Sequence, residues 1–274
     1  MTQKVLVFGG TQQSGKSTAA KFVVALLMKL AGRLRDFELD DDGNLEVMTG
    51  TIDVNGKIVE GKGILDLYRN DYQFVNYALE RIWPVCKIYN FAYELKMAAC
   101  NIFSLNPVNV FGTNEQKDTP THIKYIDIAH LLTAGRNIEY AKKYNFNVDD
   151  PPTDLCISHR DLMQDFGTGI CRQIDQDCWV NACWNKIKAE GYEQVIIDDM
   201  RFESEVDTCR KNGAYLTLLT RNPFPSEHAS EQILKIKRKK FDYVLDNANL
   251  TLQQKNDQLI TVLQNCGWIT TELT

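Results

Sequence analysis

Short apolar runs alternate with longer amphipathic segments along most of this chain. The apolar runs predict buried strands at 5–8, 85–91, 194–197, 214–220 and 241–245. Apolar residues recur at helical spacing in 19–34, 92–103, 203–212 and 252–266. Strands separated by helices predict an α/β fold, in which a mostly parallel sheet lies between two helical layers.

Two stretches interrupt this alternation. Residues 37–60 contain short β-rich pieces with the hairpin signals Asp42-Gly43 and Asn55-Gly56, which predict a small inserted β-meander. A helix over 64–83, stopped by Pro84, is expected after it. The second stretch, 121–157, includes a predicted helix at 126–144. We therefore predict one domain over 1–274, with insertions at 33–84 and 121–157.

A glycine-rich motif directly follows the first predicted strand. It has the form G-x-x-x-x-G-K-[ST] and reads Gly10-Thr11-Gln12-Gln13-Ser14-Gly15-Lys16-Ser17, followed by Thr18. Glycines let backbone N–H groups turn onto phosphate oxygens, the lysine reaches the β- and γ-phosphates, and the serine hydroxyl ligates Mg²⁺. The strand before it and the amphipathic helix after it are the context that such a loop requires. The motif predicts a P-loop that binds ATP with Mg²⁺, in the fold of the P-loop NTPases.

Net charge, apolar runs and cysteine spacing argue against several other classes of protein. The net charge of −5 argues against a large nucleic-acid footprint, and no apolar run is long enough to span a membrane. The first strand begins almost at the N-terminus, which leaves no room for a signal peptide, so a cytoplasmic protein is expected. The 8 cysteines are scattered without a CxxC pair, which suggests neither zinc nor a disulfide frame. The oligomeric state stays open, and a homodimer is one option.

The loop alone does not separate kinases, switch GTPases and mechanical ATPases. A GTPase would need an Asn-Lys-x-Asp guanine-binding tetrad, which the sequence lacks. A mechanical ATPase places acidic residues after a strand, and Asp198-Asp199 could serve in that way. This pair runs directly into Arg201, however, and carboxylates beside an arginine suit a metal together with a phosphate.

Phosphoryl transfer to a nucleoside monophosphate makes a specific demand on the protein. The acceptor phosphate is already largely dianionic near neutral pH, so it needs positive charge and positioning rather than a strong base. Arginine is favoured because its planar fork bonds phosphate oxygens in bidentate fashion. The candidate cations are Lys96, Arg160, Arg172, Arg201 and Arg221. Arg201 and Arg221 directly follow apolar strands, whose carboxyl ends are where ligands lie in this architecture.

Several segments together resemble the bacteriophage-type deoxynucleoside monophosphate kinases. Besides the glycine-rich loop, the similar phrases are Asn90–Lys96, Phe111-Gly112 to Lys117, Arg160-x-Leu162-x-Gln164-x-x-Gly167-Thr168 with Arg172 and Trp179 after it, Asp199-x-Arg201-Phe202-x-x-Glu205, Leu219-Thr220-Arg221, His228-x-Ser230-Glu231 and the last strand with Asp246-Asn247. Their order and spacing cover 1–31, 86–120 and 158–266. The resemblance implies ATP-dependent phosphorylation of deoxynucleoside 5′-monophosphates on an adenylate-kinase-like fold, in the host cytoplasm for a phage protein.

The expected roles follow from both lines of argument. The loop residues and Arg221 would bind ATP, and Ser17 would bind Mg²⁺. Asp199 would bind Mg²⁺ through water or contact the acceptor, with Asp198 in support, and which of the two is the functional carboxylate stays open. Acceptor phosphate and transition-state charge would fall to Arg160, Arg172 and Arg201 beside Lys16, with Lys96 as a weaker companion. Gln164 and Thr168 could contact the base or sugar, or could only cap and pack their helix. Two alternatives stay open: a kinase acting on a hydroxymethylated base in DNA, and an ATP-binding regulatory protein without transfer activity.

Overall fold

The computed structural model describes residues 3–52, 56–225 and 229–270. The chain divides into two compact units, the first made of residues 1–91 and 183–274 and the second of residues 92–182. Each unit has its own apolar core. The prediction of a single domain with two insertions remains a prediction.

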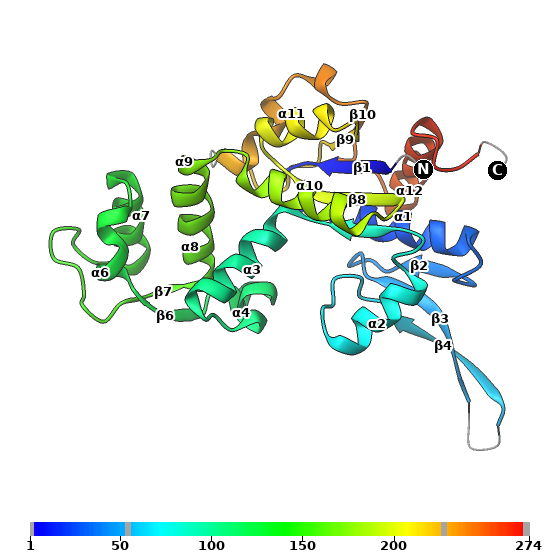
Figure 1. Cartoon of the computed structure of the whole chain (residues 1–274), viewed down its shortest axis with the longest axis horizontal. Helices are drawn as coiled ribbons and strands as arrows, with labels where there is room; N and C mark the ends of the chain where they lie inside the picture. The colour runs from blue at the N-terminus through cyan, green and yellow to red at the C-terminus, as the bar shows by residue number, and fades with distance from the viewer. Residues whose placement is uncertain (1–2, 53–55, 226–228, 271–274) are drawn as a thin grey trace. The chain divides into compact units, whose positions relative to one another are not determined.

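A parallel sheet forms the centre of the first unit (Figure 1). Its strands are β1 (Lys4–Gly9), β5 (Lys87–Tyr89), β8 (Gln194–Met200), β9 (Tyr215–Leu219) and β10 (Tyr243–Leu245), in the order β10-β9-β1-β8-β5. Each pairing is parallel. The predicted α/β class and parallel sheet are therefore confirmed. Because parallel strands end at the same edge, the segments after β1, β8, β9 and β10 meet there.

Helices bury both faces of this sheet. Leu6 and Phe8 pack in one core with α1 (Lys16–Leu30) and α12 (Leu252–Asn265). Val5 and Val7 are equally buried and point to the opposite face, since neighbouring residues of a strand alternate. The first unit also contains α11 (Glu203–Lys211) and most of α10 (Cys178–Glu190), each with a buried apolar side.

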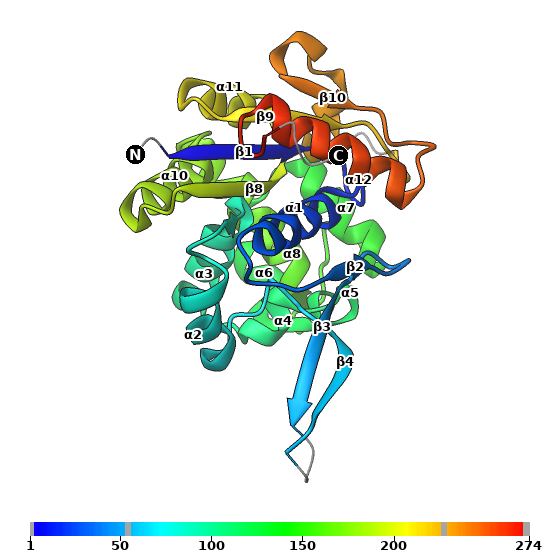
Figure 2. The same ribbon diagram turned by 90° about the vertical axis from the view of Figure 1, so that its right-hand side faces the viewer.

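The predicted β-meander is present. Strands β2 (Phe37–Leu39), β3 (Leu45–Ile52) and β4 (Ile58–Ile64) form an antiparallel sheet (Figure 2). The helix expected over 64–83 is shorter: α2 spans Tyr72–Arg81. It begins there because the Asp71 side chain accepts the Phe74 amide as an N-cap, which leaves 65–71 as a turn.

The second unit is mainly helical. It contains α3 (Phe91–Phe103) except its first residue, α4 (Pro107–Phe111), α5 (Asn114–Lys117), α6 (Tyr125–Ile128), α7 (Ala134–Tyr144), α8 (His159–Gln164), α9 (Arg172–Ile174) and the paired strands β6 (Pro120–Lys124) and β7 (Cys156–Ser158). The single helix expected over 126–144 is interrupted by a 3₁₀ turn and restarts at an N-cap on Thr133. Buried Asp165 anchors α7, because it accepts hydrogen bonds from Arg136 and Tyr140.

The helix that carries Arg160 and Gln164 changes its winding at its end. Residues Asp165–Cys171 form a π-helix that continues α8. A π-helix is rare and often marks a functional segment. Its Gly167 is closely packed, since a Cβ there would lie 2.6 Å from a methyl carbon of Leu95.

Candidate functional site

The glycine-rich loop leaves β1 and returns the chain into α1. A Cβ on Gly10 would lie 2.4 Å from the Ser14 Oγ and 3.0 Å from the Leu219 carbonyl oxygen, so no larger residue fits. Gly15 has a φ of 95°, which favours glycine. Both glycines of the motif are thus required by the backbone path itself.

Lys16 is held over this loop. Its side chain is buried, at 6% exposure, and Nζ donates to the carbonyl oxygens of Gly10 at 2.8 Å and Thr11 at 2.6 Å. The first turn of α1 has no acidic residue, and Gly15 provides no capping side chain. The amides and the positive end of the helix dipole are therefore left for an anion.

Polar side chains tie the loop to the ends of β9 and β10. The Thr11 hydroxyl donates to the Arg221 carbonyl oxygen at 3.1 Å, and the Arg221 amide donates to Asn247 Oδ1 at 2.9 Å. Asn247 in turn donates from Nδ2 to the Ser14 carbonyl oxygen at 2.8 Å. Asn247 thus fixes both the loop and the backbone of Arg221, a role that the sequence did not assign to it.

The acidic pair after β8 splits into two different environments. Asp198 is 3% exposed, and the Tyr68 hydroxyl and the Ser17 side chain hydrogen-bond to it. Burial, followed by the negative charge of Asp199, raises the pKa of Asp198 to about 6. Asp199 instead accepts the Phe91 amide at 2.8 Å, at the start of α3. Asp198 is therefore the carboxylate of the pair that contacts Ser17, and the metal role predicted for Asp199 stays a prediction.

Tyr68 is a further residue of this site, and the sequence does not predict it. It lies in the turn between β4 and α2, where its amide donates to Asp66 at 2.9 Å and its neighbour Leu67 is buried in the core. No local pattern marks it, because its contact with Asp198 joins positions 130 residues apart. The β-meander insertion thus contributes a hydroxyl to the carboxylate beside Ser17.

Replacing Tyr68 by phenylalanine should weaken this part of the site without unfolding the chain. We expect a loss of about 1–2 kcal/mol in unfolding free energy, since a hydrogen bond to a carboxylate is removed and the ring is kept. We also expect a changed metal concentration for half-maximal activity. Thermal unfolding and a magnesium titration of activity measure the two effects. Tyr72→Phe, at an exposed position of α2, is the matched control and should change neither.

Arg201 follows Asp199 at the end of β8. The Glu205 carboxylate accepts the amides of Arg201 at 2.8 Å and Phe202 at 3.0 Å, and so caps the start of α11. Glu205, the last residue of the segment from Asp199 that resembles the family, therefore has a structural role. In the first unit, Lys16, Ser17, Asp198, Arg201 and the Arg221 backbone therefore all lie at the carboxyl edge of the sheet.

The remaining candidates lie in the second unit. Arg160, on α8, donates from Nε to Asp118 at 2.6 Å and from Nη2 to Asn114 at 3.0 Å. Burial and the positive charge of Arg160 lower the pKa of Lys117. The Lys96 ammonium lies 5.1 Å from the centre of the Phe111 ring. Arg160 and Lys117 thus form a pair of neighbouring cations.

The other predicted acceptor residues surround the π-helix. Gln164 is the last residue of α8, Thr168 lies within the π-helix, and Arg172 begins α9, where it donates to the Gln176 carbonyl oxygen at 3.3 Å. Trp179 donates from Nε1 to the Gly167 carbonyl oxygen at 3.1 Å. Trp179, which belongs to the segments that resemble the family, therefore stabilises the π-helix. His228 lies outside the described residues.

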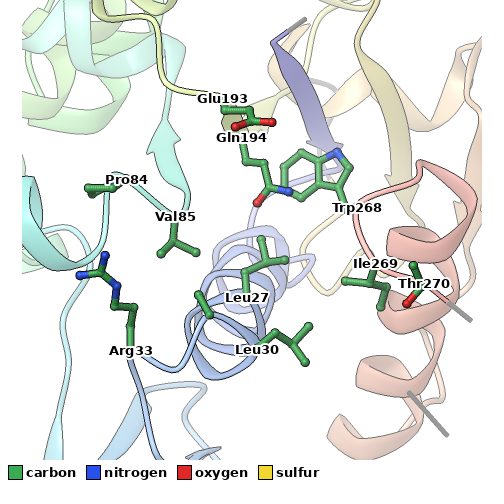
Figure 3. Close-up of a pocket in the computed structure, with 11 residues that line it drawn as sticks. Leu27, Leu30, Arg33, Pro84, Val85, Glu193, Gln194, Trp268, Ile269 and Thr270 are labelled. Atoms are coloured by element: carbon green, nitrogen blue, oxygen red, sulfur yellow. The ribbon is translucent and has the colours of Figure 1, made fainter. Parts of the chain in front are cut away.

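A pocket of about 690 Å³ lies elsewhere on the first unit (Figure 3). Leu27 and Leu30 from the end of α1 face Trp268 and Gln194 across it. Glu193 and Gln194 stand at the amino end of β8, so this pocket is at the opposite edge of the sheet from the glycine-rich loop.

Metal-binding capacity in the described ranges is limited. No group of three or more His, Cys, Asp or Glu side chains there could hold a metal ion. Ser17 and Asp198 offer a hydroxyl and a buried carboxylate, which fits Mg²⁺ held partly by the phosphates of a nucleotide. Among the same residues, no helix is both long and apolar enough to cross a membrane.

Two comparisons with known proteins agree. Residues 137–256 match the family model described as Deoxynucleotide monophosphate kinase. The chain is also similar to the "Putative deoxynucleotide monophosphate kinase" of Acanthamoeba polyphaga mimivirus, with 28% identity over 194 residues that cover 70% of this chain and 89% of the viral protein. Together they confirm the family resemblance predicted from the sequence.

Proposed function

We propose that this chain, a relative of the phage- and virus-type deoxynucleoside monophosphate kinases, transfers the γ-phosphoryl group of ATP to a deoxynucleoside 5′-monophosphate. The observation that carries the proposal is the meeting of the Gly10–Ser17 loop with the buried Asp198 at the carboxyl edge of a parallel sheet. Kinase chemistry and deoxynucleotides come from the family, and the use of ATP is inferred from the loop.

The donor half of the reaction falls to the first unit. The loop amides and Lys16 would hold the β- and γ-phosphates, with Arg201 and Arg221 near the same edge. Ser17 and Asp198 would hold Mg²⁺, which neutralises charge on the phosphate chain when bound. Tyr68 orients the Asp198 carboxylate by donating its hydroxyl proton. Asp199 remains a proposed acceptor contact.

The acceptor half needs cations rather than a base. An oxygen of the dianionic monophosphate attacks the γ-phosphorus, the bond to the β-phosphate oxygen breaks, and ADP leaves. Arg160, Arg172 and Arg201 would bind the acceptor phosphate and stabilise transition-state charge, and Lys96 would assist them. Gln164 and Thr168 remain proposed contacts to the base or sugar. The interrupted winding of the π-helix supports a functional role for Thr168.

A panel of acceptors tests the proposed function. The purified chain is incubated with labelled ATP, Mg²⁺ and each of the common deoxynucleoside monophosphates, and the diphosphates are separated. We expect transfer to at least one of them. Transfer to duplex DNA alone would support the modified-base kinase, and ATP hydrolysis unaffected by any monophosphate would support the regulatory protein. Either result would overturn the proposal.

Arg160→Ala should affect the acceptor more than the donor. We expect kcat/KM for the monophosphate to fall by about ten- to a hundred-fold, because a charge-assisted contact to phosphate is lost, while ATP affinity stays within about twofold. Arg210→Ala is the matched control, since Arg210 is similarly exposed (44% against 38%) and likewise pairs with one aspartate. Equal losses for ATP and acceptor would show that Arg160 is structural.

A further inference from the structure

Lys255 is an unusual residue of α12. Its side chain is buried, at 7% exposure, in a helix whose exposed face is polar. No hydrogen bond or ion pair within the described part of the chain involves its ammonium group. Buried lysines are normally paired, because an ammonium ion removed from water without a counter-charge is strongly unfavourable.

The ammonium group is aimed at the glycine-rich loop. Nζ of Lys255 lies 3.8 Å from the position that a Cβ on Gly15 would occupy, and Asn247 Nδ2 lies 3.6 Å from the same position. Of the described charged groups, Arg221 is the one that acts on Lys255, and it is also a cation. Burial and Arg221 together lower the pKa of Lys255 to about 8.

Lys87 is a buried lysine with a structural role, and its partners contrast with the surroundings of Lys255. Lys87 lies on β5, donates to Glu190 and stands 3.8 Å from the centre of the Trp83 ring. Lys255 has neither a carboxylate nor an aromatic ring described beside it. The charge of Arg221 acts on Lys255, and Lys255 lies next to a loop of the phosphate-binding type. An anion would neutralise two such cations, whereas a neutral ligand would leave their repulsion in place.

We propose that Lys255 is a donor-binding residue that contacts the polyphosphate of the nucleoside triphosphate beside Gly15, and that it forms a two-cation clamp with Arg221. This inference rests on the proposed function for the identity of the ligand. Arg221 is predicted from the sequence to bind ATP, whereas no sequence pattern marks Lys255. Asn247 fixes the position of the Arg221 backbone relative to the loop, since it hydrogen-bonds both of them.

The clamp has a consequence for stability. At pH 7 Lys255 is charged in both the folded and the unfolded chain, and partial burial together with Arg221 makes the charged form less favourable in the folded chain. Between about 8 and 10.5 the folded chain releases the proton first, so stability gains from this group as the pH rises. Lys255→Met should therefore raise Tm at pH 7, and the gain should fade towards pH 10.5.

Calorimetric titration of the full chain, without an acceptor, tests the clamp. The ligands are ATP and inorganic tripolyphosphate, which has no base. For Lys255→Met we expect about ten- to a hundred-fold weaker binding of both, together with a higher Tm. Lys255→Arg, which keeps the charge, should retain more of the affinity. Lys87→Met is the control, and it should lower Tm, because Glu190 loses its partner, while ATP affinity stays unchanged.

The outcomes separate this inference from the proposed function. Unchanged binding of ATP by Lys255→Met would overturn the clamp and leave the kinase proposal intact. Weaker ATP binding with unchanged tripolyphosphate binding would overturn the contact to phosphate. A wild-type chain that binds neither ligand would overturn the proposed function and the clamp together.

Discussion

Replacing Lys16 by methionine is expected to reduce phosphoryl transfer by at least about a thousand-fold in kcat, since preorganised positive charge is removed from the transferring group. Methionine keeps the length and apolar stem of the side chain but not the ammonium group. In the structure this ammonium bonds the carbonyl oxygens of Gly10 and Thr11 and so lies over the loop that would carry the γ-phosphate. Single-turnover transfer from labelled ATP to the preferred monophosphate measures the effect.

Two further variants are controls for this interpretation. Lys16→Arg should not restore activity, because the carbonyl pair holds a compact amine and a planar guanidinium has a different shape. Lys21→Met, at the next lysine of α1, should leave transfer within about twofold, since Lys21 bonds only the Gly43 carbonyl oxygen among described partners. Thermal unfolding of each variant separates lost catalysis from lost folding. Substantial transfer by a folded Lys16→Met chain would refute the assigned role.

The parts of the fold that follow from local patterns were predictable. Strand β8 was expected at 194–197 and α11 at 203–212, and both are present within a few residues. Apolar runs and helical spacing reflect which residues become buried, so elements predicted from them agree with the structure. The parallel arrangement then brings the loop, Asp198 and Arg221 to one edge without any further information.

The missed features depend on contacts between distant segments. Tyr68 and Lys255 became site candidates only when the fold brought them to Asp198 and Gly15. The start of α2 was misjudged because the periodicity of 64–71 resembles a helix, whereas the Asp71 cap fixes the boundary. The π-helix at Asp165–Cys171 was also not predicted from the sequence.

The alternation of side chains along β8 bears on the open choice between Asp198 and Asp199. Side chains alternate along a strand, so Asp198 shares a face of β8 with Ile196, and Asp199 shares the other face with Ile197. Ile196 belongs to the core that contains α1, the helix that begins at Lys16 and Ser17. Regular alternation would direct Asp198 towards Ser17, but the register of β8 against β1 shifts between Ile197 and Met200, so the choice between the two carboxylates stays a prediction.

A comparison of Asp198→Asn with Asp199→Asn tests this assignment by activity. Asparagine keeps the shape and one acceptor oxygen but removes the charge that a metal ion needs. Asp198→Asn should reduce transfer by about a hundred-fold or more, and raised Mg²⁺ should restore part of the loss. Asp199→Asn should cost about tenfold or less, because its oxygen can still accept the Phe91 amide. The reverse order of the two losses would return the metal site to Asp199.

The same pair differs in stability with a defined dependence on pH. The folded-state pKa of Asp198 is raised from 3.8 to about 6, so its carboxylate destabilises the folded chain above pH 6 and has no such effect below about pH 4. In EDTA at pH 7.5, Asp198→Asn should therefore gain up to about 3 kcal/mol of unfolding free energy, and the gain should vanish near pH 4. Asp199→Asn should show no such gain, since its carboxylate accepts an amide at the start of a helix.

Loss of activity together with increased stability would mark Asp198 as a residue kept for function at the expense of the fold. Denaturant titrations at both pH values measure the difference, and an Asp198→Asn chain less stable than the wild type at pH 7.5 would contradict it.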